Sequence, residues 1–344
     1  MPAAAFRLKP EATPGFSLPR RSAKREGGWL PASAGRMRKP VALEIPASVD
    51  ALQQAMAGRQ YIAGRGLAVS AYLALRLQRP LFLEGEPGVG KTEVAKVLAS
   101  ALGTELIRLQ CYEGLDISHA VYEWNYPRQI LEIRLLEGAH ALDPRTAERE
   151  LFTDTFLIKR PLLRAIEQTR ERPPVLLIDE IDRADEEFEG YLLELLSDFQ
   201  ITIPELGTIR ADEPPVVVIT SNRTREVHDA LKRRCVYCWI DYPSAEIERR
   251  IIAARLPGVP DRLAGQVTAF VQELRTAELY KTAGVSETLD WAAALVALDR
   301  DELDAETVEE TLGILLKNQE DIQAVRGERI QAMLNRALAR GAGS

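Results

Sequence analysis

One stretch of the chain, Gly85-Glu86-Pro87-Gly88-Val89-Gly90-Lys91-Thr92, has residue types and spacing suited to phosphate chemistry. It fits the pattern G-x-x-x-x-G-K-[ST], in which glycines let backbone N–H groups wrap around phosphate oxygens. Lys91 is expected to reach the β- and γ-phosphates, and Thr92 to hold Mg²⁺. The stretch predicts a binding site for a nucleoside triphosphate such as ATP, and a chance glycine-rich turn is the alternative.

Two acidic residues follow a second apolar run, Leu176-Leu177-Ile178. Asp179 at the strand tip would bind Mg²⁺ through its hydration shell, and Glu180 would orient and deprotonate an attacking water. A solvated acidic turn after a strand is the alternative. The phosphate-binding loop upstream favours the catalytic interpretation.

Two more segments carry polar residues that suit the same chemistry. Asn222 follows the apolar run 216–220 and would position the water or sense the γ-phosphate; a turn residue at a strand end is the alternative. Arg233 and Arg234 end a short helix, from which an arginine would reach a nucleotide held by a neighbouring subunit. A solvated basic helix C-terminus, favoured by the helix dipole, is equally compatible with this pattern.

Alternating strands and helices must position these residues. The apolar runs at 175–179 and 216–220 are continuous, which is typical of strands buried on both faces of a parallel sheet. The fold class predicted is α/β, with ligands at the carboxyl ends of the strands. Strands are expected at 81–84, 105–109, 175–179, 216–220 and 236–240, and helices at 48–56, 67–77, 92–101, 161–171 and 187–198.

The chain divides into three predicted parts. Residues 1–44 form a basic extension rich in Pro, Ala, Ser and Gly, which indicates a disordered tail. A translation start at Met37 is the alternative for most of it. Residues 45–243 form the α/β domain, and residues 244–344 a helical domain with helices at 244–255, 261–280, 287–299, 304–316 and 319–339.

Composition sets limits on the class of protein. The net charge of -7 argues against bulk attraction to nucleic acid, and no apolar run approaches the roughly 20 residues that span a bilayer. The three cysteines give no even disulfide framework, which suits a reducing cytoplasm. Cys235 and Cys238 have C-x-x-C spacing without a second ligand pair, so we expect buried apolar cysteines, and the same of Cys111.

Tyr122, Trp124 and Tyr126 alternate along the chain, so an extended segment would carry three aromatic side chains on one face. Packing within a hairpin is the first interpretation of this stripe. A surface loop that contacts a partner or substrate is the second.

The order of these motifs resembles that of AAA+ ATPases. Insertions at 110–138 and 199–214, the second with the pattern of a β-hairpin, are similar to those of the helix-2-insert clade and of its MoxR family. The segments 111–116, 122–126 and 284–291 look most like the CoxD branch, which is associated with maturation of the molybdenum–copper site of carbon monoxide dehydrogenase.

The resemblance implies a ring-forming ATPase, in particular a hexamer, with ATP and Mg²⁺ at subunit interfaces. It implies that Arg234 acts in trans, with Arg233 as second choice, and that a partner with a von Willebrand factor A domain and a metalloenzyme client exist. One position departs from the family: Ser286-Glu287-Thr288 stands where many members carry a lid arginine. Lid sensing of the nucleotide is therefore in doubt, or another basic residue supplies it.

Two other functions remain open on the sequence alone. A nucleic-acid motor of the same clade is disfavoured by the acidic balance and by a hairpin, 199–209, without a basic residue. A non-catalytic, nucleotide-gated binding module is disfavoured because the predicted base, Glu180, is intact.

Overall fold

The computed structural model describes residues 43–138, 151–167 and 172–341 of the chain. The predicted basic tail up to residue 42 and the alternative start at Met37 lie outside these residues. The helix predicted at 161–171 ends at Ile166 with Glu167 as its C-cap, and residues 168–171 lie outside the described residues.

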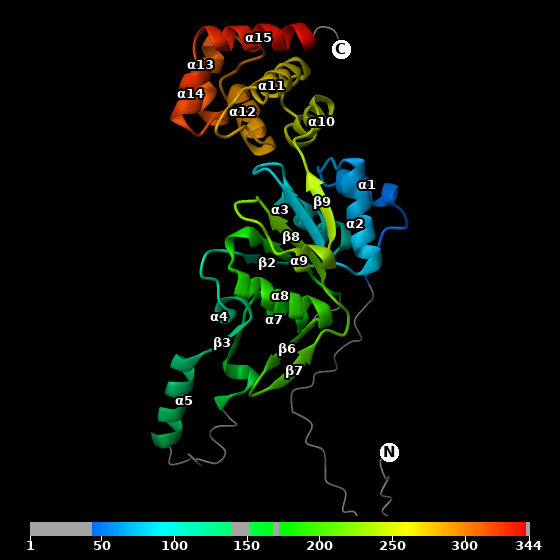
Figure 1. The fold of residues 1–344 in the computed structure, drawn as a ribbon, viewed down its shortest axis with the longest axis vertical. Coiled ribbons are helices and arrows are strands. Elements are labelled where there is room, and N and C mark those ends of the chain that lie inside the picture. The colour runs from blue at the N-terminus through cyan, green and yellow to red at the C-terminus, as the bar shows by residue number, and fades with distance from the viewer. Residues whose placement is uncertain (1–42, 139–150, 168–171, 342–344) are drawn as a thin grey trace, which may run out of the picture. The chain divides into compact units, whose positions relative to one another are not determined.

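A five-stranded sheet forms the centre of the α/β part (Figure 1). All of its neighbouring strands pair in parallel, in the order β2-β5-β8-β1-β9. The five predicted strands are therefore confirmed, with ends that differ by one residue at most. Their bounds are β1 (Leu81–Gly85), β2 (Leu106–Gln110), β5 (Val175–Asp179), β8 (Val216–Ser221) and β9 (Val236–Ile240).

Helices cover both faces of this sheet, which explains the continuous apolar runs. Leu177 of β5 packs with the cluster that includes α1 (Val49–Ala57), α2 (Arg65–Leu77) and α3 (Lys91–Leu102). Its neighbours Leu176 and Ile178 point to the other face, because side chains alternate along a strand. That face is covered by α7 (Pro161–Ile166), α8 (Glu186–Asp198) and α9 (Asp229–Arg234).

The first insertion lies between β2 and α7 and contains the three aromatic residues that were predicted to share one face. It contains α4 (Ile117–Ala120), β3 (Tyr122–Trp124), α5 (Tyr126–Gly138), a 3-10 turn (Asp154–Phe156) and β4 (Leu157–Lys159), the last paired antiparallel with β3. Trp124 is buried and meets Phe152 edge to face at 5.1 Å, as hairpin packing predicts. Tyr126 instead begins a helix and is 58% exposed, so the stripe of three is wrong.

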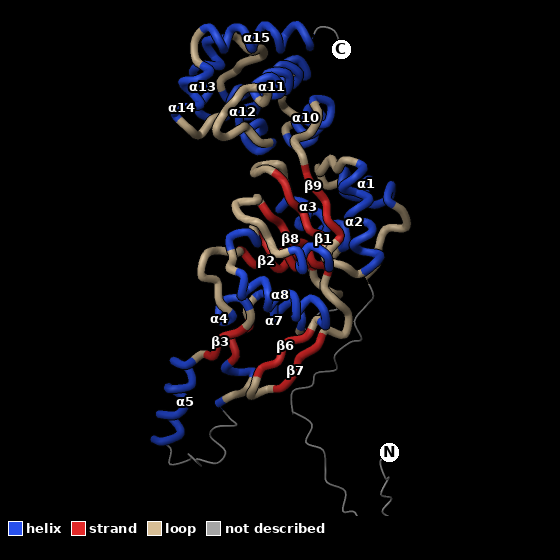
Figure 2. Tube along the Cα trace, viewed as in Figure 1, coloured by secondary structure: helices blue, strands red, loops and turns tan. Residues whose placement is uncertain are grey.

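The second insertion is the predicted hairpin. Strands β6 (Gln200–Ile203) and β7 (Gly207–Arg210) pair antiparallel (Figure 2). Ile201 and Ile203 are buried against the α7–α8 side of the core, which fixes the hairpin on the domain.

The helical part packs around Trp291 and Phe270, whose ring centroids lie 5.5 Å apart. Its helices are α10 (Ala245–Arg255), α11 (Asp261–Leu274), α12 (Val285–Ala297), α13 (Ala305–Leu315), α14 (Gln319–Val325) and α15 (Glu328–Gly341). The last strand ends at Ile240, close to the predicted boundary at 243.

Two predicted helices of this part are wrong in extent. The helix expected at 319–339 is two helices, because Gly327 adopts a left-handed conformation with φ of 69°. The helix expected at 261–280 ends at Leu274. Beyond it, the backbone N–H groups of Tyr280 and Lys281 donate to the Asp321 carboxylate at 2.7 and 3.0 Å, which holds this segment as a loop against α14.

Candidate nucleotide-binding site

The phosphate-binding loop joins the carboxyl end of β1 to the first turn of α3. Lys91 is 6% exposed, and its Nζ donates to the carbonyl oxygens of Gly85 and Glu86, each at 2.7 Å. Burial lowers the pKa of Lys91 from 10.5 to about 8, because desolvation disfavours the charged amine. The lysine therefore stays cationic at neutral pH while lying within the loop.

Asp179 is the buried centre of the site. It is 1% exposed, and its Oδ1 accepts from Thr92 Oγ1 at 2.9 Å and from Thr220 Oγ1 at 2.6 Å. Thr92 and Asp179 are thus brought together across 87 positions of sequence. A hydroxyl and a carboxylate at this distance form the oxygen donor set that Mg²⁺ takes in proteins, so the residues fit the predicted ion.

Glu180 follows directly and has a left-handed backbone, with φ of 56°. Such a conformation is uncommon for a residue with a side chain, and it concentrates at functional sites. The Glu180 amide donates to Thr220 Oγ1 at 2.9 Å, and its Oε2 accepts from Gln110 Nε2 at 3.0 Å and Arg183 Nη1 at 3.3 Å. The side chain is held in one orientation beside Asp179.

Sequence reasoning missed several residues of this network, and two of them lie on β2. Arg108 donates to Asp179 Oδ2 from Nε at 3.0 Å and from Nη2 at 2.6 Å, and Gln110 contacts Glu180. Their signal is that polar side chains alternate with Ile107 and Leu109 in a strand that is otherwise apolar. Only the register, which pairs Gln110 with Asp179, shows that this polar face meets the acidic residues.

Asn222 is placed by a buried neighbour of the acidic pair. Asp182 is 2% exposed, and its carboxylate accepts from the backbone N–H of Asn222 at 3.2 Å. It also accepts from the backbone N–H and the hydroxyl of Thr224, at 2.8 and 2.7 Å. These bonds fix the turn after β8. Asn222 thereby lines the same cavity as Lys91 and Glu180.

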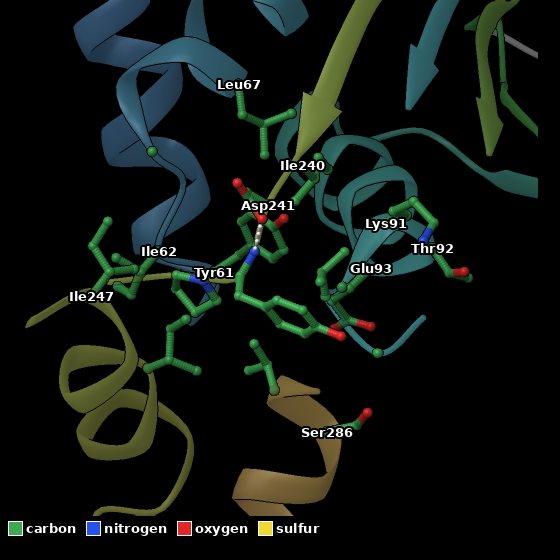
Figure 3. Close-up of a pocket in the computed structure, with 18 of the residues that line it drawn as sticks. Tyr61, Ile62, Leu67, Lys91, Thr92, Glu93, Ile240, Asp241, Ile247 and Ser286 are labelled. Atoms are coloured by element: carbon green, nitrogen blue, oxygen red, sulfur yellow. Dashed lines mark hydrogen bonds between the residues drawn. The ribbon is translucent and has the colours of Figure 1, made fainter. Parts of the chain in front are cut away.

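This cavity has a volume of about 650 Å³ and continues from the loop to an apolar end. In Figure 3, Tyr61 lies between Ile62 and Glu93 and points toward Glu93. Leu67, Ile240 and Ile247 add apolar surface from α2, β9 and α10. A polar end with a lysine and an apolar end with an aromatic ring together suit a nucleotide.

The helical part contributes the opposite wall largely through its backbone. The amides of Val285 and Ser286, at the start of α12, donate to Gly88 O at 2.9 and 3.3 Å. Gly284 lies so close that a Cβ placed there would be 2.9 Å from Gly88 Cα. Ser286, at the position where many members of the resembled family carry a lid arginine, lines the cavity, and Glu287 Oε2 accepts from the Gly284 backbone N–H at 3.0 Å.

A different arginine of the helical part reaches the cavity. Arg255, at the end of α10, lines it and lies 3.3 Å from Glu93 Oε1 on α3. The Arg255 side chain is 35% exposed, so the ion pair between Arg255 and Glu93 is in contact with solvent.

The two candidate trans arginines are exposed and lie in the last turn of α9. Arg234 donates from Nε to Ser197 Oγ at 3.3 Å and from Nη1 to Ala230 O at 3.2 Å. Arg233 is exposed and has no hydrogen bond or ion pair to any residue that the structure describes. Neither arginine is among the described residues that line the nucleotide cavity of its own chain.

The cysteines are confirmed as buried free thiols. Burial raises the pKa of Cys111 and of Cys235 to about 12, which disfavours the thiolate that a metal would need. Over the described ranges, no group of His, Cys, Asp and Glu has a geometry that could hold a metal ion by itself.

The comparison with protein families identifies the part of the chain that carries this site. The model described as AAA domain (dynein-related subfamily) matches residues 80–235. The chain contains an AAA+ ATPase domain. The match covers the phosphate-binding loop, the acidic pair, Asn222 and both candidate trans arginines, and it makes the chain an ATP-hydrolysing enzyme.

The curated relatives of this chain are distant. Uncharacterised proteins of Staphylococcus haemolyticus and Staphylococcus aureus are each 25% identical over 229 residues, which is 64% of this chain and 77% of theirs. Among solved structures, the RuvB Holliday junction branch migration motor of Thermotoga maritima is similar, with a TM-score of 0.41 and 18% identity over 80% of this chain and 74% of that one.

Among residues 43–138, 151–167 and 172–341, we find no helix that combines the length and the apolar character of a membrane span.

Proposed function

We propose that this protein hydrolyses ATP with Lys91, Thr92, Asp179, Glu180 and Asn222 of one subunit. The observation that carries the proposal is the convergence of the Thr92 and Thr220 hydroxyls on Asp179 Oδ1, at 2.9 and 2.6 Å. The backbone N–H of Glu180 donates to the same Thr220 hydroxyl at 2.9 Å, which ties the second carboxylate to this centre. A phosphate loop, an acid suited to Mg²⁺ and a second, oriented carboxylate are the parts that phosphoryl transfer to water needs.

The residues divide the work between binding and proton transfer. Lys91 and the backbone N–H groups of residues 88–92 bind the β- and γ-phosphates. Bound at Thr92 and Asp179, Mg²⁺ would neutralise charge on the phosphate oxygens. Glu180 accepts the proton of the attacking water, with its carboxylate held by Gln110 and Arg183, while Asn222 positions that water from the cavity wall.

We further propose that the protein assembles as a ring, with six subunits as the expected number. The position of Arg234 supports this, because an exposed arginine that does not line its own cavity can meet a phosphate held by a neighbouring subunit. Arg234 is the first candidate for that role and Arg233 the second.

The client is proposed from the MoxR-type order of motifs and its CoxD-like segments. It is a metalloenzyme during maturation, molybdenum–copper carbon monoxide dehydrogenase in particular, with a von Willebrand factor A domain protein as co-worker. The exposed apolar side chains of Ile130, Leu131 and Leu135 on α5 support a protein client, because such side chains bind other proteins. We place this activity in the cytoplasm, whose reducing conditions suit the three free cysteines.

Steady-state ATP turnover across protein concentration, for the wild type and for Glu180→Gln, tests the catalytic proposal. Wild-type turnover per subunit should rise steeply as subunits assemble. Glu180→Gln should bind ATP with normal affinity and assemble, yet lose about 10²- to 10⁴-fold in turnover, the contribution of a general base. Normal turnover in this variant would exclude Glu180 as the base.

Two additions separate the alternatives. Double-stranded and single-stranded DNA should leave turnover unchanged, and stimulation by either would favour a nucleic-acid motor. Carbon monoxide dehydrogenase produced together with Glu180→Gln should lack copper that it contains when produced with the wild type. Equal copper content would contradict the client assignment and leave the ATPase assignment intact.

A further inference from the structure

The carboxylate of Glu84 lies buried directly before the phosphate-binding loop. Glu84 is 4% exposed on β1, and it precedes Gly85, the residue whose carbonyl accepts from Lys91 Nζ. The catalytic scheme above does not use this carboxylate. A buried charge is costly unless it is paired and hydrogen-bonded, so its partners indicate what it does.

Its charged partner comes from the helix that carries the candidate trans arginines. Lys232 Nζ lies 3.2 Å from Glu84 Oε1 and 3.4 Å from Oε2, across 148 positions of sequence. The ammonium also lies over the ring of Phe82, 5.7 Å from its centroid. Lys232 stands two positions before Arg234 on α9 (Asp229–Arg234), a helix of only six residues.

A third side chain completes the arrangement from the neighbouring strand. Tyr237 on β9 donates its hydroxyl to Glu84 Oε2 at 2.8 Å, and its ring stacks on Phe82 at 6.1 Å between centroids. Burial, together with the Glu84 carboxylate, raises the pKa of Tyr237 to about 12, so the hydroxyl remains a donor at any ordinary pH. Glu84 therefore has a charged and a neutral donor, one on each side of the junction between α9 and β9.

We infer that Glu84 is a positioning residue for the trans arginine: through Lys232 it ties the short helix α9 to the start of the phosphate-binding loop of the same subunit. This inference rests on the proposed trans role of Arg234. Since the chain turns from α9 into β9 at Cys235, anchors on Lys232 and Tyr237 fix both sides of the segment that presents Arg234. The pair thereby links a subunit's own nucleotide site to the arginine that it supplies to the next.

Glu84→Gln tests the inference. A subunit with this change keeps its own phosphate-binding residues, so its Kd for a fluorescent ATP analogue should be unchanged. Its turnover in a homogeneous assembly should fall about tenfold or more, because a small misplacement of a group that acts in the transition state has an effect of this order. Lys232→Arg keeps a cation opposite Glu84 and should retain most of the turnover.

Mixed assemblies show in which subunit the defect acts. A Lys91→Ala subunit cannot use ATP but presents a normal arginine, so mixing it with Glu84→Gln should restore turnover above the sum of the two proteins. Mixing Glu84→Gln with Arg234→Ala should restore nothing, because neither presents a working arginine. The reverse pattern, or loss of ATP binding in Glu84→Gln, overturns the positioning role.

The reference mixture is Lys91→Ala with Arg234→Ala. If it gains turnover and the mixture of Lys91→Ala with Glu84→Gln does not, only the role of Glu84 is wrong. If the reference mixture itself fails, the trans role of Arg234 falls, and the inference falls with it.

Two more variants separate positioning from loss of folding. Glu84→Gln/Lys232→Met removes both charges together, so it leaves no lone buried charge and should melt close to the wild type. It should still behave as Glu84→Gln does in the mixtures, and wild-type turnover in this double variant would overturn the inference. Asp50→Asn breaks an exposed pair with Arg65, 72% and 59% exposed, and should change neither melting nor turnover.

Discussion

The two walls of the nucleotide cavity are built in different ways. The wall from the α/β core consists of charged and hydroxyl side chains, with Asp179 accepting from Thr92, Thr220 and Arg108. The wall from the helical part meets the loop through the backbone, with the amides of Val285 and Ser286 on Gly88 O. Residue types in the sequence indicate which side chains can bind a nucleotide. A backbone contact is indicated only by the small residues that allow two segments to approach closely.

Because the core wall depends on side-chain hydrogen bonds, we predict that loss of the Thr220 hydroxyl lowers both stability and turnover. Thr220→Val keeps the shape of the side chain but leaves the Glu180 amide without its acceptor and Asp179 without a 2.6 Å donor. We expect a loss of about 3 kcal/mol in the free energy of unfolding, as for an orphaned amide and a lost bond to a charged group, together with reduced turnover. Chemical denaturation measures the first. Thr220→Ser, which keeps the hydroxyl, should restore both, and a stable, active Thr220→Val would show that the network is dispensable.

The helical wall depends on a close backbone approach, so we predict that a larger side chain at Gly284 lowers ATP affinity. Gly284→Ala adds a methyl group 2.9 Å from Gly88 Cα and 2.8 Å from Glu287 Oε2, which forces α12 away from the loop. Overpacking of this kind costs about 1–3 kcal/mol, and we expect ATP affinity to fall accordingly in equilibrium titrations. Gly258→Ala, also in the helical part but with nothing within 4 Å of the added methyl, is the matched control. Equal affinities in the two variants would mean that the contact plays no part in binding.

A pH titration distinguishes charge from backbone contacts in phosphate binding. With a pKa of about 8, Lys91 loses its proton as pH rises through that value, whereas backbone N–H groups do not titrate. ATP affinity should therefore be constant below it and fall about tenfold from about pH 7 to about pH 9. Lys91→Arg should abolish the decrease, because a guanidinium stays charged in this range. A flat profile in the wild type would contradict a titration of Lys91 near pH 8 that controls phosphate binding.

The smallest effect is expected where the helical part does contribute a charge. Arg255→Gln removes the pair with Glu93, whose side chains are 35% and 27% exposed. A solvated pair of this kind contributes at most about 1 kcal/mol, so ATP affinity should change little, and less still in high salt. A loss of about a hundredfold, which is about 2.8 kcal/mol, would instead make Arg255 the replacement for the missing lid arginine.

Sequence alone determined the parts of the protein that depend on local pattern. The phosphate-binding loop, the acidic pair after an apolar strand and Asn222 are short motifs, because glycine freedom, strand burial and ligand type are set by neighbouring residues. The parallel sheet followed from continuous apolar runs, which only burial on both faces explains.

Only the tertiary structure decided which distant residues support those motifs. Arg108 and Gln110 reach the acidic pair through strand register, and Glu84 meets Lys232 across 148 positions. Gly284 touches Gly88 through a close backbone approach that has no signature in residue type beyond the glycine itself. Pairing and packing between remote segments depend on the whole chain, so local periodicity could name the reactive groups but not the contacts that hold them.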